Sequence, residues 1–372
     1  MKIAMIGHKR IPSREGGIEI VVEELSTRMA ALGHQVDVYN RKGKHVSDKT
    51  LDKNEHKLKE YKGVRIITIP TISKKSLDAL LYSFIASIRA LFGHYDVIHY
   101  HAEGPSVMLL IPHVFGIRTV VTIHGLDWQR AKWGGFATKY LMLGEKIAAK
   151  YADEVIVLSK NVQKYFKDTY NRETKYIPNG VNIPEKKEAQ IITEKYGLHK
   201  DEYILFLARL VPEKGLHYLL EAYKQIDTDK KLVVAGGSSH SNEYVDKINT
   251  MAAEDNRVIM TGFVQGRELE ELFSNCFLYV LPSDVEGMPI SLLEAMSYRN
   301  CCVVSNIDEC TEVVGDKAQV FVKGNVQDLT YQIQNLCSNP EKVIKMKDGT
   351  DNYILSKNNW DNVVRKILEQ YR

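Results

Sequence analysis

The sequence has few cysteines and no long apolar run. Its five cysteines among 372 residues include no C-x2-C pair and no metal-ligand spacing. Such cysteines are typical of reduced, mostly buried thiols in a cytoplasmic protein. The most apolar window, Leu77 to Gly93, contains Asp78 and Arg89, so it is too short and too polar to span a bilayer. The opening MKIAMIG lacks the apolar region of a signal peptide, so we expect no secretion signal.

The sequence also lacks a large net charge, which is only +3. The charge is unevenly distributed along the chain. Residues 1–184 contain 28 Lys+Arg and 18 Asp+Glu, whereas residues 185–372 contain 22 Lys+Arg and 29 Asp+Glu. A hydrophobic content of 44% excludes a disordered chain. The basic first half contains no arginine-rich recognition helix or aromatic stacking motif, so we expect no nucleic-acid partner.

Short buried strands alternate with amphipathic helices along the whole chain. The predicted strands are apolar without a period-2 alternation, as expected for strands covered on both faces. They are 2–6, 35–39, 64–69, 96–100, 118–124, 154–159, 203–208, 231–235, 257–261, 277–282, 301–305 and 318–322. This alternation predicts an α/β fold with two doubly wound, Rossmann-like parallel sheets.

The length and a Pro- and Gly-rich segment near residues 178–187 predict two domains. We expect an N-terminal domain at 1–184, a C-terminal domain at 185–357, and an amphipathic helix at 358–372 that packs back on the first domain. Ligands of such sheets bind beyond the carboxyl ends of the strands, in a cleft that two such domains would form.

The first strand leads to Gly16 and Gly17, just before a helix. Helix N-terminal N–H groups suit a phosphate, and glycine permits its close approach. The spacing is neither G-x-G-x-x-G nor a P-loop, and a plain glycine turn is the alternative.

Two cations follow the strand at 203–208, and two carboxylates follow the strand at 277–282. Arg209 offers a bidentate fork and Lys214 a mobile charge, so both could hold one diphosphate, although they could also be solvated surface cations. Glu286 and Glu294 could accept hydrogen bonds from sugar hydroxyls, with Pro289 expected as the first helical residue. Otherwise, Glu286 is a partner of the helix dipole and Glu294 an exposed helix residue.

Arg209, Lys214, Glu286-x7-Glu294 and the Gly16–Gly17 loop, in that order, resemble the retaining glycosyltransferases of family 4, which have the GT-B fold. The resemblance covers almost the whole chain. The opening GHKRIPSREGG is similar to a bacterial subgroup that includes rhamnosyltransferases of capsule and cell-wall polysaccharide assembly.

The resemblance implies roles for each matching position. Gly16, Gly17, Arg209 and Lys214 would hold the donor diphosphate. The ribose and donor sugar would contact Glu294, Glu286 and the segment Gly287, Met288, Pro289 and Ile290. His124, Asp127 and Glu286 would form the catalytic group, with Asp127 orienting or deprotonating the acceptor. A structural histidine and a helix N-cap are the respective alternatives for His124 and Asp127; His101 is a further candidate. The segment Asn306 to Glu312 departs from the Gly-Gly-x-Pro-Glu loop of many relatives, which puts local donor contacts in doubt.

The sequence therefore predicts a metal-independent hexosyltransferase without a cofactor, using a nucleoside-diphosphate sugar and a glycan or lipid-linked saccharide acceptor. The Asp227-Thr-Asp229 pair lies in a polar loop before a strand and is interpreted as a turn. A nucleotide-sugar 2-epimerase and a non-catalytic carbohydrate-binding relative remain alternatives. Lysines in residues 41–62 and the apolar helix at 77–92 suggest peripheral contact with an anionic membrane; a solvated loop and a core-facing helix are the alternative.

Overall fold

The computed structural model describes residues 1–43, 58–72, 75–129, 134–237 and 242–372. The chain divides into two compact units. Unit 1 comprises Met1–Asn179 and Trp360–Arg372, and unit 2 comprises Gly180–Asn359. The structure thus divides the chain after residues 179 and 359, where the sequence suggested 184 and 357.

Unit 1 is built on an eight-stranded sheet with the order β3-β4-β2-β1-β5-β6-β7-β8. All pairs are parallel except β3 with β4. The strands are β1 (Lys2–Ile6), β2 (Gln35–Lys42), β3 (Glu60–Tyr61), β4 (Val64–Pro70), β5 (Val97–His101), β6 (Arg118–Ile123), β7 (Glu154–Val157) and β8 (Lys175–Tyr176). The helical segments are α1 (Gly17–Ala31), α2 (Lys75–Leu91), α3 (Glu103–Ser106), η2 (Val107–Leu109), α4 (Leu110–Val114), η3 (Asp127–Gln129), α5 (Phe136–Tyr151), α6 (Lys160–Tyr170) and α16 (Trp360–Glu369).

Unit 2 is built on a six-stranded parallel sheet with the order β11-β10-β9-β12-β13-β14. The strands are β9 (Tyr203–Leu207), β10 (Lys231–Ala235), β11 (Val258–Gly262), β12 (Leu278–Leu281), β13 (Cys301–Ser305) and β14 (Gln319–Phe321). The helical segments are α7 (Ile191–Tyr196), η4 (Pro212–Lys214), α8 (Leu216–Tyr223), α9 (Asn242–Ala253), α10 (Gly266–Asn275), α11 (Ile290–Ser297), α12 (Asp308–Val314), α13 (Val326–Cys337), α14 (Pro340–Lys347) and α15 (Thr350–Lys357).

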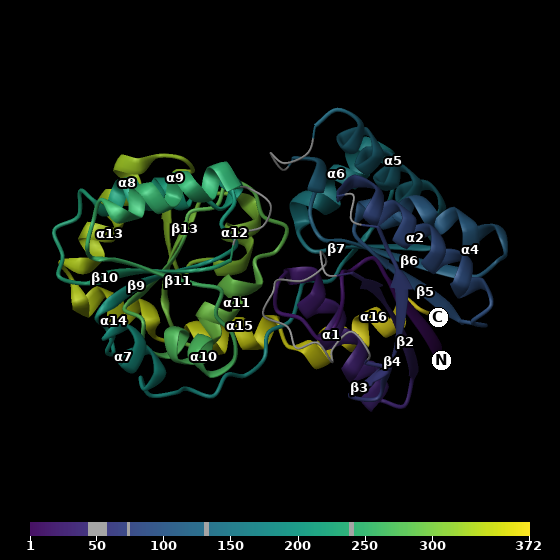
Figure 1. The fold of residues 1–372 in the computed structure, drawn as a ribbon, viewed down its shortest axis with the longest axis horizontal. Helices are drawn as coiled ribbons and strands as arrows, with labels where there is room; N and C mark the ends of the chain where they lie inside the picture. Colours follow the sequence, from purple (N-terminus) through teal and green to yellow (C-terminus); the bar gives the residue numbers. More distant parts are fainter. Residues whose placement is uncertain (44–57, 73–74, 130–133, 238–241) are drawn as a thin grey trace. The chain divides into compact units, whose positions relative to one another are not determined.

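All twelve predicted strands are present, and their ends agree to within two residues except at β2, which continues to Lys42. Two strands escaped the sequence prediction, β3 and β8, because each is only two residues long. Helices cover both faces of each sheet (Figure 1). The doubly wound prediction is therefore confirmed for both units.

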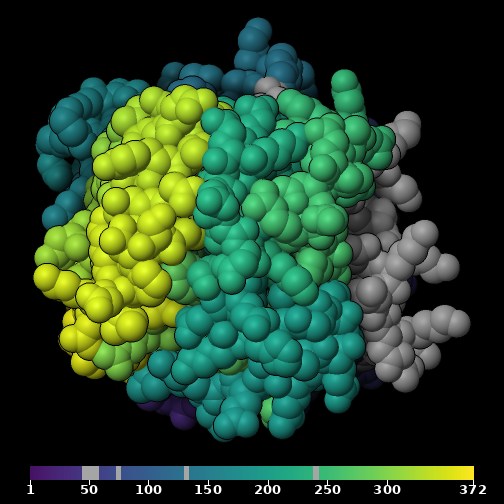
Figure 2. Space-filling view, turned by 90° about the vertical axis from the view of Figure 1, so that its left-hand side faces the viewer, coloured from purple at the N-terminus to yellow at the C-terminus, as the bar shows by residue number. Residues whose placement is uncertain are grey.

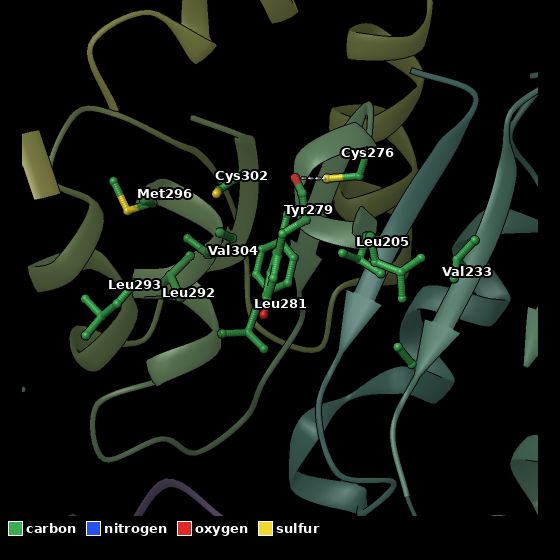
Figure 3. Close-up of a cluster of buried hydrophobic side chains, with 14 of the residues drawn as sticks. Leu205, Val233, Cys276, Tyr279, Leu281, Leu292, Leu293, Met296, Cys302 and Val304 are labelled. Carbon is green, nitrogen blue, oxygen red and sulfur yellow. Dashed lines mark hydrogen bonds between the residues drawn. The ribbon is translucent and has the colours of Figure 1, made fainter. Parts of the chain in front are cut away.

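The cores form where apolar strand residues meet the covering helices. In unit 2, Leu205, Val233 and Tyr279 face one cluster and Ile204, Val234 and Val280 face another, as expected for strands buried on both sides. Figure 3 shows the first cluster, with side chains of α11 packed against β12 and β13. On the outside of this unit, α13 packs against α8 and α14, and Figure 2 shows the surface formed by these yellow and teal segments.

Candidate functional site

The candidate donor residues of unit 2 lie where the winding of the sheet reverses. β9 lies between β10 and β12, and the chain winds outward from β9 in both directions. Ligands of doubly wound sheets bind beyond the carboxyl ends of the two strands at this reversal. Arg209 follows β9, and the loop with Glu286 follows β12. The topology therefore brings Arg209 and the loop with Glu286 to the carboxyl ends of two neighbouring strands.

Lys214 and Glu286 form a direct ion pair. The Lys214 Nζ lies 2.5 Å from Glu286 Oε1, and the Ser283 hydroxyl donates a hydrogen bond to the same oxygen at 2.7 Å. The Glu286 side chain is only 6% exposed and that of Lys214 16% exposed, so the pair is largely shielded from water. The family resemblance implies that these residues bind different parts of the donor, and the structure places them in contact with each other.

Gly215 explains how Lys214 comes so close to the end of β12. Its φ is +67°, and a Cβ at this position would lie 1.9 Å from the carbonyl oxygen of Pro282. Only glycine tolerates both the left-handed conformation and the close approach. Nearby, the Asp284 N–H donates to the Glu213 carbonyl at 2.9 Å. The segment before α8 is thereby fastened to the loop after β12.

Helix α11 carries the second carboxylate of the Glu-x7-Glu motif. Pro289 has extended ψ and precedes the helix, which begins at Ile290, so the prediction that Pro289 is the first helical residue is wrong. Glu294 is half-buried one turn into α11. Burial raises the pKa of the Tyr279 phenol in β12 well above its usual range, and the charges of Glu286 and Glu294 raise it further. Both carboxylates therefore lie near the same buried ring.

The rest of the predicted sugar-binding segment is tightly packed. Gly287, Pro289 and Ile290 are buried, and Met288 is half-buried against the core beneath α11. The Tyr279 hydroxyl bonds to Ser291 Oγ at 2.8 Å and so joins β12 to the first turn of α11 (Figure 3 shows Tyr279 in this cluster). Backbone groups of this segment are thus held by a rigid support.

The segment that departs from the family pattern, Asn306 to Glu312, follows β13 and forms the first part of α12. Asp308 and Glu309 occupy the first turn of α12. Carboxylates in this place already satisfy the positive end of the helix dipole. The Asp227–Asp229 segment is a loop before β10, in agreement with its interpretation as a turn. Among the residues that the structure describes, no group of three or more His, Cys, Asp or Glu side chains could hold a metal ion.

In unit 1 the corresponding reversal lies between β1 and β5, where two strand ends touch. Gly7, directly after β1, has φ +126°, and a Cβ there would lie 2.2 Å from the His101 carbonyl oxygen. Further along this loop, Gly16 precedes α1 in extended conformation, and exposed Gly17 begins the helix. Glu19 lies in the first turn, and its Oε1 accepts a hydrogen bond from the Lys9 N–H at 2.8 Å. The predicted phosphate site therefore already has a carboxylate beside it.

Histidines from β5 and from the residue after β6 form a buried stack. His101 Nδ1 lies 3.1 Å from His124 Nε2, and the rings of His99 and His101 stack with centroids 4.2 Å apart. Burial lowers the pKa of His99 to about 3 and that of His101 well below its usual value. The structure thus places His124 and His101 together, and the His101 ring is neutral at pH 7.

A group of buried carboxyls beside Asp127 escaped the sequence analysis. Asp127 begins η3, and its N–H donates to Glu103 Oε1 at 3.3 Å. Burial, with the charges of Asp127 and Glu145, raises the pKa of Glu103 to about 10. Glu145 accepts hydrogen bonds from the Trp128 indole and from two tyrosine hydroxyls. Glu103 could have been suspected because it follows a buried strand directly, as the other candidates do.

Comparisons with known proteins agree with this architecture. The family model described as Glycosyltransferase Family 4 matches residues 15–185, and the model described as Glycosyl transferases group 1 matches residues 188–353. Among solved structures, a Thermosynechococcus elongatus sucrose-phosphate synthase superposes with a TM-score of 0.84 at 22% identity, covering 100% of this chain and 98% of that chain. Anabaena HepE, in complex with UDP and glucose, superposes with a TM-score of 0.81 at 20% identity, covering 99% and 98%.

Relatives in sequence carry related names. An uncharacterized glycosyltransferase of Methanocaldococcus jannaschii is 25% identical over 397 residues, covering 100% of this chain and 98% of the relative. The Escherichia coli UDP-Gal:alpha-D-GlcNAc-diphosphoundecaprenol alpha-1,3-galactosyltransferase is 26% identical over 327 residues, covering 82% of each. The chain belongs to glycosyltransferase family 4 and has the GT-B fold.

Proposed function

We propose that the protein transfers a hexose from a nucleoside-diphosphate sugar to a hydroxyl of a lipid-linked glycan, with retention at the anomeric carbon. The observation that carries the proposal is the placement of two cations and two carboxylates at the reversal point of the unit 2 sheet. We assign the donor to unit 2 and the acceptor hydroxyl to unit 1.

In the proposed reaction, the bond between the anomeric carbon and the diphosphate oxygen breaks as the acceptor oxygen bonds to the same face of that carbon. The acceptor loses its hydroxyl proton, and negative charge accumulates on the departing diphosphate. Arg209 and Lys214 stabilise that charge, so we expect the transfer to need no metal ion. Glu286 keeps the Lys214 ammonium in place and, with Glu294, accepts hydrogen bonds from donor hydroxyls.

Unit 1 supplies the acceptor groups in this proposal. Asp127 orients the acceptor hydroxyl and takes its proton, and His124 offers a hydrogen bond to the donor sugar. The hydrogen bond from the Asp127 N–H to Glu103 fixes the start of η3 and hence the position of the Asp127 carboxylate. Because Gly17 has no side chain, a substrate group can approach the N-terminus of α1 closely.

The acceptor class is supported by the relative from Escherichia coli, whose name specifies a diphosphoundecaprenol-linked sugar. Rhamnose is the first donor sugar to test, because the sequence of the first loop resembles rhamnosyltransferases. Five cysteines without a disulfide, four of them buried, fit a reducing compartment. We therefore place the reaction in the cytoplasm, at the membrane surface that holds the acceptor.

A two-step experiment tests the proposal. Purified protein is first screened for thermal stabilisation by dTDP-, UDP- and GDP-sugars, since a bound nucleotide raises stability with the logarithm of its saturation. The stabilising donor is then incubated with and without lipid-linked acceptors, and the product anomer is determined by NMR. Donor consumption only with acceptor and a product of retained configuration support the proposal. Conversion of the donor without acceptor would indicate an epimerase, and no stabilisation by any donor would indicate a non-catalytic binder.

A further inference from the structure

Three neighbouring helices of unit 1 expose apolar side chains to solvent. α4 packs against both α2 and α5, so the three helices form one continuous surface (Figure 1). Phe92 and Phe115, which directly follow α2 and α4, are 78% and 69% exposed, and Phe136 at the start of α5 is 76% exposed. Isolated exposed apolar residues are common, but a contiguous group across adjacent helices marks an interaction surface.

α2 shows the pattern most clearly, because it is apolar on two sides. Tyr82, Ala86 and Ala90 are buried in the unit 1 core. Leu77, Phe84, Ile88 and the following Phe92 recur at helical spacing on the exposed side. One side of this helix packs on the core, as the alternative expected, while apolar side chains on the other side are exposed.

Cations accompany the exposed apolar residues of these three helices, and among their described side chains no carboxylate is exposed. Lys139, Lys146 and Lys150 are exposed on α5, which also exposes Met142 and Leu143. Of the described side chains on α2, α4 and α5, the acidic ones are Asp78 and Glu145, and both are buried. Asp78 is paired with Arg41, with 3.2 Å between the charged atoms, and Glu145 accepts internal hydrogen bonds. The surface is therefore apolar and positively charged.

We propose that this surface, defined as the exposed faces of α2, α4 and α5, rests on a bilayer containing anionic lipid. A surface that combines phenylalanines with lysines and lacks exposed carboxylates matches the interface of such a bilayer, where apolar groups enter the acyl boundary and cations meet the headgroups. A second protein copy would bring like charges together across the surface, which disfavours a homodimer. No described helix is both long and apolar enough to cross a bilayer, so the contact is interfacial.

This inference rests on the proposed lipid-linked acceptor for its biological meaning. α5 begins nine residues after Asp127 in the sequence, and its Glu145 is hydrogen-bonded to Trp128 of η3. The proposed acceptor group is thus tied directly to a membrane-facing helix. Of the lysines in residues 41–62 from which membrane contact was expected, Lys44, Lys49, Lys53 and Lys57 lie outside the described residues, and the proposed surface includes none of the lysines of this segment.

Vesicle flotation tests the inference without any turnover. The full-length protein is mixed with vesicles of phosphatidylcholine alone or of phosphatidylcholine with phosphatidylglycerol. We expect binding to the mixed vesicles, reduced more than about tenfold in Lys139→Glu/Lys146→Glu/Lys150→Glu, since each cation contributes about fivefold near an anionic surface. A matched control, Lys323→Glu/Lys342→Glu/Lys345→Glu, reverses three exposed lysines of unit 2 and should bind as the wild type does.

A second variant tests the apolar part. Phe84→Ser/Ile88→Ser/Phe92→Ser should weaken flotation, whereas Ile344→Ser on the exposed side of α14 should not. Thermal unfolding confirms that each variant is folded. Equal binding to both vesicle types, or sedimentation as a dimer that the Phe84→Ser/Ile88→Ser/Phe92→Ser variant dissociates, would overturn the proposal. If the proposed function is wrong, flotation still reports whether the protein binds the bilayer. Sugar transfer to a short water-soluble acceptor needs no membrane, so it tests the proposed function independently of the bilayer contact.

Discussion

At the residue scale, the Lys214–Glu286 pair links the two halves of the proposed donor site. A lysine paired with a buried carboxylate is held in position before substrate arrives. The same pairing makes the residues interdependent, since removal of one leaves the other charged and poorly solvated. A mutation of either residue is therefore expected to disturb the other residue as well.

We expect Lys214→Ala to lower kcat by about 10²- to 10³-fold, the usual effect of removing one preorganised group that stabilises a developing charge. Steady-state kinetics with the identified donor measure the change. Lys323→Ala, on the surface of the same unit, is the control and should leave kcat unchanged. Normal turnover by Lys214→Ala would show that the diphosphate binds elsewhere.

Glu103 should destabilise the folded protein increasingly as the pH rises. Because its pKa is raised to about 10 in the folded state, the native protein holds a proton that the unfolded chain releases above its ordinary pKa. The contribution of this group to stability is complete only below the unfolded pKa and is lost progressively up to about pH 10.

Glu103→Gln removes that dependence, so we predict a higher melting temperature than the wild type, with a difference that grows between about pH 5 and pH 9. Glu145→Gln is the matched comparison and should be destabilising by about 1.5–3 kcal/mol, since it replaces one accepting oxygen with an amide NH2 that faces hydrogen-bond donors. A pH-independent difference for Glu103→Gln would mean that Glu103 is ionised in the folded protein.

At the element scale, the sequence predicted strands well because most of them, such as β1, β10 and β13, are short runs of apolar residues buried on both faces. Strand ends then located Arg209, Glu286 and His124 by a general rule of parallel sheets. Contacts between distant elements, such as Lys214 with Glu286, depend on packing and left no local signal. Glu103 was missed because a carboxyl before Gly-Pro looks like an ordinary loop residue.

The turn between η4 and α8 gives a prediction about backbone packing. Gly215→Ala should destabilise unit 2 and weaken donor binding, because its Cβ would collide with the Pro282 carbonyl. Gly262→Ala is a matched control: its φ of +73° imposes a similar backbone cost, but nothing lies within 4 Å of the added Cβ. Thermal shift with and without donor measures both, and equal losses would mean that the close approach is unimportant.

The buried histidines of β5 lead to a prediction about the stability of unit 1 at low pH. His99 and His101 stay neutral when folded, whereas the unfolded chain protonates them below about pH 6.5. Unit 1 should therefore lose stability as the pH falls from about 6.5 towards 4. Residues 180–359 of unit 2 include no tryptophan, whereas Trp128 and Trp360 belong to unit 1, so tryptophan emission reports on unit 1. If the melting temperature followed by tryptophan emission stayed constant over this pH range, His99 and His101 would not be neutral in the folded protein.

At the scale of the whole molecule, unit 1 is completed by the last residues of the chain. α16 packs against α1, and the Tyr371 hydroxyl bonds to His99 Nδ1 at 2.6 Å. α16 also buries Val363, Val364 and Ile367, worth about 1.5–3 kcal/mol each.

Truncation after Asn359 should therefore destabilise unit 1 by several kcal/mol while leaving unit 2 able to bind the donor nucleotide. Emission of the remaining tryptophans follows the first effect, and isothermal titration with nucleotide follows the second. Tyr371→Phe is a milder change that should cost about 1 kcal/mol. Loss of nucleotide binding on truncation would show that the units do not fold independently.

The path of the chain makes unit 2 an insertion within unit 1. Val181 donates its N–H to the Asn358 carbonyl at 2.7 Å and forms a parallel bridge with Asn359, so the chain enters and leaves the insertion at neighbouring residues. A segment with adjacent ends can be replaced as a cassette with little disturbance of its host. Exchange of residues 180–359 for the equivalent part of a relative should then carry the donor preference with it and leave acceptor choice to the recipient.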